Sequence, residues 1–141
     1  MSWLSDPFRP WRSRYTSSRN ETFLRLFPCL VYLILISLVS SIPGSSIPKV
    51  ADDRIEHSLE YFGLGVLLLL AAVAFLRDRI RPIHIAATAA FGVCYALFDE
   101  WHQSFVPGRD SSLKDVGFDT LGVSCALILF YLGATRTRTA P

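Results

Sequence analysis

The chain has 141 residues, of which 51% are hydrophobic and 18% charged, and its mean hydropathy is +0.36. This balance is too apolar for an ordinary small soluble domain, and so short a chain cannot enclose four long apolar runs in one core. With 14 basic and 12 acidic residues the net charge is only +2, which gives no indication of nucleic-acid binding. The composition therefore predicts an integral membrane protein.

Four stretches of 16 or 17 residues contain no Asp, Glu, Lys or Arg, and they cover residues 26–42, 61–76, 82–98 and 120–135. Crossing a hydrocarbon core of about 30 Å takes about 20 helical residues, so we extend the second stretch back through Leu59 and the fourth back to Val116. Helices are expected because unpaired backbone groups are costly in lipid. The sequence predicts an all-α protein, a short antiparallel bundle of four transmembrane helices over residues 26–135, between tails at residues 1–25 and 136–141.

The basic residues are distributed unevenly between the two predicted sides of the membrane. Ten lie on one side, in residues 1–25, 77–81 and 136–141. The other side, residues 43–58 and 99–115, has four basic residues and, counting Glu60 at the membrane edge, eight acidic ones. Because positive residues are retained in the cytoplasm, both termini are predicted to be cytoplasmic and both acidic segments extracytoplasmic.

The first predicted span also has features of a signal peptide. A basic leader precedes it, and the small residues Ser37, Ser40 and Ser41 lie near its end. The leader is long for a signal peptide, and an uncleaved span keeps the charge pattern consistent over all four helices. We therefore expect the span to be retained. The three cysteines, Cys29, Cys94 and Cys125, lie in apolar runs without paired spacing and indicate no disulfide set.

A first polar group lies at the predicted outer end of the second span. Asp53, His57 and Tyr61 follow one another at intervals of four residues, so they share one face of a helix. Glu56 and Glu60 form an adjacent stripe whose mutual repulsion favours a nearby cation such as Arg109. Polar residues at a membrane edge are costly unless they pair or contact water, so we expect this group to be functional or paired.

A second polar group ends the third span and begins the fourth. Asp99, His102 and Gln103 are spaced to share one helix surface, and Ser112 is placed to cap the fourth helix. We expect Arg109 to pair with a carboxylate. The polar network predicted from both groups comprises Asp53, His57, Glu60, Tyr61, Asp99, Glu100, Gln103, Arg109, Ser112, Asp115 and Asp119.

These residues carry a resemblance to a known family. The spacing Asp53-xxx-His57-xxx-Tyr61, with the run DExxQxFxPGRxxSxxD over residues 99–115, resembles the VanZ-like family of small bacterial membrane proteins. The resemblance covers residues 50–133 and departs at Asp119, where the family usually has Asn. The family is named after a protein associated with low-level teicoplanin resistance, so the resemblance implies a cell-envelope function in the bacterial cytoplasmic membrane.

Two functional hypotheses follow. In the first, a non-enzymatic protein contacts membrane lipid or a lipid-linked wall precursor in an extracytoplasmic polar pocket, with Arg109 as the anion contact, and affects glycopeptide susceptibility. In the second, an intramembrane hydrolase or transferase uses His57, Asp99 and Glu100 as catalytic residues. We favour the first. His57 and His102 are weak metal-ligand candidates without HExxH or CxxC spacing, so we expect no metal or other cofactor. The oligomeric state is left open.

Overall fold

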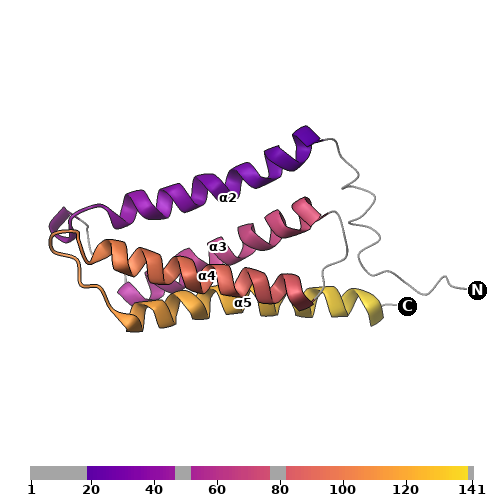
Figure 1. The fold of residues 1–141 in the computed structure, drawn as a ribbon. Coiled ribbons are helices and arrows are strands. Elements are labelled where there is room, and N and C mark those ends of the chain that lie inside the picture. The colour runs from indigo at the N-terminus through magenta and orange to yellow at the C-terminus, as the bar shows by residue number, and fades with distance from the viewer. Residues whose placement is uncertain (1–18, 47–51, 77–81, 140–141) are drawn as a thin grey trace, which may run out of the picture.

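The computed structural model describes residues 19–46, 52–76 and 82–139, and in these ranges the chain forms helices and no strand. The elements are α2 (Arg19–Ser40), the short 3-10 helix η1 (Gly44–Ser46), α3 (Asp53–Leu76), α4 (Pro82–Gln103) and α5 (Leu113–Thr139). Figure 1 shows the four long helices lying lengthwise beside one another, each antiparallel to the one before it. The predicted all-α antiparallel arrangement is confirmed.

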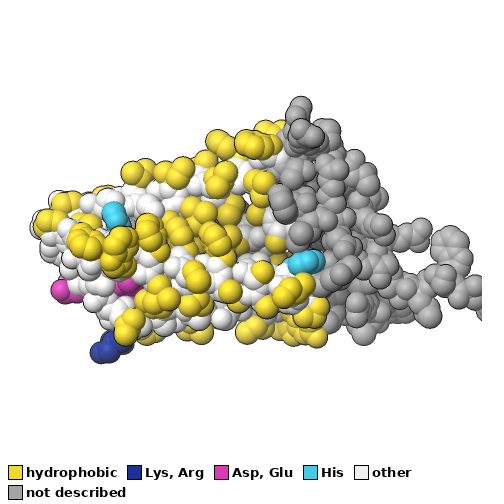
Figure 2. Space-filling model, in the orientation of Figure 1, with side chains coloured by type: hydrophobic (Ala, Val, Ile, Leu, Met, Phe, Trp, Pro, Cys, Tyr) yellow, Lys and Arg dark blue, Asp and Glu magenta, His cyan; other side chains and the backbone are white. Residues whose placement is uncertain are grey.

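Within the described residues, three helices are long and apolar enough to cross a membrane, over Arg54–Ala72, Pro82–Gln103 and Leu113–Gly133. The apolar part of α2, Leu26–Ser40, is shorter than such a span. Large apolar side chains are exposed along the bundle, and Figure 2 shows them covering much of its length on the face drawn, with the described acidic and basic side chains that this view shows lying at one end. This distribution suits a lipid-facing surface around a protein interior.

The helices extend beyond the charge-free stretches. α4 continues through Gln103, and α3 and α5 begin at Asp53 and Leu113, several residues before the apolar runs. Both of these N-termini are capped: Asp52 Oδ1 accepts the backbone N–H of Arg54 at 3.0 Å, and Ser112 Oγ accepts that of Lys114 at 3.1 Å. The helical backbone also enters both predicted tails, since α2 begins at Arg19 and α5 ends at Thr139.

α3 and α5 approach each other closely because glycines lie between them. A Cβ atom on Gly122 would lie 2.2 Å from the carbonyl oxygen of Ser58 and 2.8 Å from the backbone nitrogen of Phe62. A Cβ atom on Gly65 would likewise lie too close to Val123 and Ala126 of α5. Small residues at such a contact allow two helix backbones to pack in van der Waals contact, which is how helices associate in lipid.

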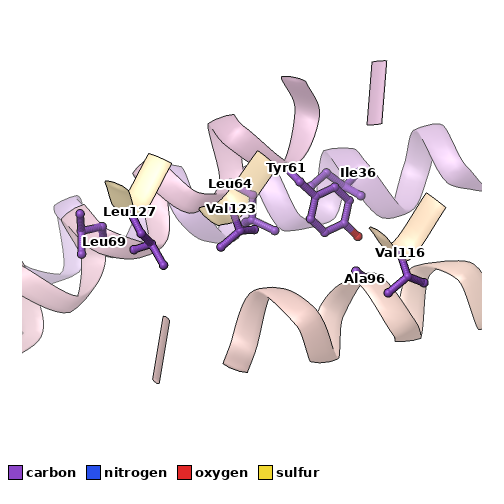
Figure 3. Close-up of a cluster of buried hydrophobic side chains, with 8 residues drawn as sticks. All are labelled: Ile36, Tyr61, Leu64, Leu69, Ala96, Val116, Val123 and Leu127. Carbon is purple, nitrogen blue, oxygen red and sulfur yellow. The ribbon is translucent and has the colours of Figure 1, made fainter. Parts of the chain in front are cut away.

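The apolar core follows the length of the bundle. Its buried members, drawn in Figure 3, are Ile36, Tyr61, Leu64, Leu69, Ala96, Val116, Val123 and Leu127. All four long helices contribute to it, so α2 packs into the same interior as the three helices whose apolar stretches are long enough to cross a membrane.

Candidate functional site

Three helices bring a buried ionisable side chain each into one group at the same end of the bundle. His57 lies in the second turn of α3, Glu100 in the last turn of α4 and Asp119 in the second turn of α5. The His57 Nδ1 atom is 2.9 Å from Asp119 Oδ1, and Glu100 Oε2 accepts the backbone N–H of Ser112 at 2.6 Å. One potential ligand atom from each of the three residues lies within 4.8 Å of the others. The two polar groups found in the sequence therefore meet in the interior.

Asp99 connects α4 to the end of α2. Its Oδ2 atom accepts hydrogen bonds from the Ser40 hydroxyl and from the Gln103 amide nitrogen, each at 2.9 Å. All three side chains are buried. Hydrogen bonds to a buried carboxylate are among the stronger ones in proteins, so this contact fixes how the two helices align.

Two more serines extend this contact into a polar seam between α2 and α4. Ser37 Oγ lies 2.9 Å from the Tyr95 hydroxyl, and Ser41 Oγ lies 2.9 Å from Nε2 of His102. Sequence analysis did not assign Ser37, Ser40 and Ser41 to the polar network. Their spacing of three and four residues was the available signal, because it places all three on one face of a helix.

Arg109 contacts the backbone rather than a carboxylate. Its Nη2 atom donates to the carbonyl oxygen of Val39 at 3.0 Å, and among the described residues no ion pair joins it to Asp99 or Asp115. The expected pairing of Arg109 with a carboxylate is not found. The Arg109 loop is also held to η1 by a hydrogen bond from Gly44 N to the Pro107 carbonyl oxygen.

The other predicted residues are placed as follows. Tyr61 is fully buried in the core, and Glu60 is half-buried with its backbone carbonyl accepting the Tyr32 hydroxyl at 3.0 Å. Asp115 is half-buried in the first turn of α5. His102 bonds to Ser41 and is not part of the group of potential ligands around His57. The side chain of Asp53 lies outside the described residues.

Several buried polar atoms near this end of the bundle have no hydrogen-bond partner. Each of the three buried carboxylates has one bonded oxygen and one unpartnered oxygen: Oδ1 of Asp99, Oε1 of Glu100 and Oδ2 of Asp119. The Tyr61 hydroxyl and Arg109 Nε are unpartnered as well. Native proteins leave few such atoms, and each calls for an explanation by function, bound water or an ion. The arrangement presents oxygen acceptors to a cation or to a polar donor.

The chain matches the model of a known protein family. The family model described as VanZ/LLP1 matches residues 2–134, which is nearly the whole chain and includes every residue of the polar network. No curated protein and no solved structure matches the chain.

Proposed function

The chain belongs to the VanZ/LLP1 family and is a membrane protein, and on this basis we propose that it acts in the cell envelope by binding the polar head of a membrane lipid or of a lipid-linked wall precursor. In this proposal all four long helices span the bacterial cytoplasmic membrane and both termini are cytoplasmic. The end of the bundle that carries the buried polar residues His57, Asp99, Glu100 and Asp119, called the polar end below, then lies at the outer face, where it forms a polar pocket.

The packing of α2 supports a fourth span. Its residues Cys29 and Ile36 are buried, and its serines bond to α4, so it is part of the bundle. Its opposite face exposes large apolar side chains such as Ile34 and Leu38, which suit lipid contact. At the polar end of the bundle the side chain of Trp101 is exposed, and exposed tryptophans are typical of membrane–water interfaces.

The observation that carries the proposed binding role is the guanidinium of Arg109. It lies half-buried at the polar end, fixed through Nη2 to Val39, and its Nε–H has no hydrogen-bond partner. A guanidinium presents several donors in a fork that matches phosphate oxygens. An anionic head group bound there would satisfy the unpartnered donor of Arg109.

The test uses a teicoplanin-susceptible bacterium that expresses the chain. We expect the wild type to raise the inhibitory concentration of teicoplanin and to co-purify with anionic lipid identified by mass spectrometry. Arg109→Gln should lose both properties at normal abundance in the membrane. The matched control Lys114→Gln, which removes an exposed positive charge near the start of α5, should keep both. Unchanged lipid content and susceptibility in Arg109→Gln would contradict the proposal.

A second candidate function is an intramembrane hydrolase or transferase, and the bond between His57 and Asp119 favours it. A carboxylate that accepts a hydrogen bond from an imidazole N–H orients the ring and raises its basicity, as a general base requires. His57→Gln keeps a donor and an acceptor but cannot act as a base near neutral pH. If His57→Gln and His57→Asn both remain abundant but lose the phenotype completely, the enzymatic function is preferred. Retained phenotype favours binding.

A further inference from the structure

We propose that His57, Glu100 and Asp119 together bind one divalent transition-metal cation, for which Zn²⁺ and Mn²⁺ are the test ions. The inference does not rest on the proposed lipid-binding function, because it concerns the ion content of the protein alone. The three residues come from α3, α4 and α5, and their relative exposures are 8%, 4% and 0%. They are distant in sequence, so only the folded bundle forms the site.

The spacing of the three side chains fits one ion. Zn²⁺ bonds to nitrogen and oxygen ligands are about 2.0–2.2 Å long, which places the ligand atoms of a tetrahedral site about 3.4 Å apart. The ligand atoms of His57, Glu100 and Asp119 lie within 4.8 Å of one another, and His57 Nδ1 is 2.9 Å from Asp119 Oδ1. Small side-chain rotations therefore suffice to close the set around a cation.

In both Glu100 and Asp119, one carboxylate oxygen is hydrogen-bonded and the other is available to bind an ion. Glu100 Oε2 is fixed by the backbone N–H of Ser112, while Glu100 Oε1 is buried without a partner. Asp119 Oδ1 faces His57, while Asp119 Oδ2 is buried without a partner. Ligating carboxylates in metal sites are commonly oriented in this way by a second hydrogen bond. If the ion binds Nδ1 of His57, it takes the place of the hydrogen bond to Asp119: a neutral ring then carries its proton on Nε2, and a doubly protonated ring releases one proton to solvent.

The local charge also favours a cation. Asp99 adjoins Glu100 in α4, and Asp115 lies one helical turn before Asp119 in α5. Several carboxylates thus share one buried end of the bundle, where unbalanced charge is unfavourable. A dication balances two of them.

The chemistry of the three ligand side chains limits which metal ions can bind. One imidazole with two carboxylates suits Zn²⁺ or Mn²⁺, whereas Ca²⁺ and Mg²⁺ take oxygen ligands and Cu⁺ favours thiolate. With three protein ligands, a four-coordinate ion keeps one position for water or a ligand group.

The experiment measures ions bound to the full-length, tag-free protein in detergent. The protein is stripped with EDTA, incubated with Zn²⁺ or with Mn²⁺, passed over a gel-filtration column and analysed by mass spectrometry of the elements. We expect one ion per chain for at least one of the two metals, and a melting temperature that rises with the free concentration of that metal, because an ion that binds only the folded state stabilises it.

The variants Asp119→Asn and Glu100→Gln keep the size of the side chain and remove its charge. Both should lose the ion and the rise in melting temperature. The matched control Asp110→Asn, an exposed carboxylate in the loop between α4 and α5, should keep both. Gel-filtration elution and circular dichroism of the same samples identify a variant that misfolds, in which case the other variant is decisive.

A wild-type protein that retains neither Zn²⁺ nor Mn²⁺ would overturn the proposal, even if both variants misfold. Retention of the ion at the wild-type level by folded Asp119→Asn and Glu100→Gln would overturn it as well, because the ion would then lie elsewhere. In either case the three residues would form a hydrogen-bond network alone.

Discussion

Replacing Gly122 by alanine tests the close packing of α3 against α5. The new methyl group would lie 2.2 Å from the Ser58 carbonyl oxygen, and since ordinary contact begins near 3.4 Å the two helices would have to separate by about 1.2 Å. Overpacking costs typically about 1–3 kcal/mol, and we expect the upper end because the atoms in the way belong to the backbone and cannot rotate aside. The free energy of unfolding in detergent, measured by denaturant titration, should fall by about 3 kcal/mol.

The same helix provides the control. A Cβ atom on Gly117 would meet nothing within 4 Å, so Gly117→Ala removes only the flexibility of glycine. It should stabilise the protein by roughly 0.5–1 kcal/mol, because alanine has the higher helix propensity. If Gly122→Ala were as stable as Gly117→Ala, the close approach of α3 and α5 at Ser58 would be refuted.

Two further predictions concern the hydrogen bonds at the polar end. Ser40→Ala removes one of the two donors to Asp99 Oδ2 and should lower the free energy of unfolding by about 1.5–3 kcal/mol, whereas Ser45→Ala, at an exposed position, should have little effect. The double-mutant cycle of Arg109→Ala and Asp115→Ala should be additive within about 0.5 kcal/mol, because Arg109 bonds to a backbone carbonyl. Equal losses of unfolding free energy in Ser40→Ala and Ser45→Ala would contradict the bond of Ser40 to Asp99. A coupling energy between Arg109 and Asp115 well above ~0.5 kcal/mol would contradict the assignment of Arg109 to the backbone.

The positions of the helices could be predicted from the sequence, but their ends could not. Charge-free stretches locate apolar helices, and they stop where the first acid appears. In α4 that acid is Asp99, yet the helix continues to Gln103 because its polar residues point into the bundle and find partners there. A polar residue on the inner face of a helix does not end it.

Which residues of the site form hydrogen bonds with one another could not be predicted from the sequence, because these contacts depend on the tertiary structure. The spacing of Asp53, His57 and Tyr61 indicated a common face, but the bond of His57 to Asp119 joins residues 62 positions apart. Ser40 is small and uncharged, and its role depends on how α2 lies against α4, which no local pattern specifies. Arg109 was expected to find an opposite charge. It instead donates to the carbonyl oxygen of Val39 in the last turn of α2, which also accepts the backbone N–H of Ile42 at 3.0 Å.

The central claim is that the polar end of the bundle faces the outside of the cell, and accessibility of single cysteines in intact cells tests it most directly. The background variant has its native cysteines replaced, at Cys29, Cys94 and Cys125. Ser46→Cys, after α2, and Ser111→Cys, between α4 and α5, occupy exposed positions at the polar end, while Arg79→Cys lies between α3 and α4.

A membrane-impermeant maleimide should label Ser46→Cys and Ser111→Cys in intact cells and should label Arg79→Cys only after the cells are lysed. This result follows from the ten basic residues on one side of the membrane against four on the other. Labelling of Arg79→Cys in intact cells, with protection of Ser46→Cys and Ser111→Cys, would invert the orientation and contradict the account.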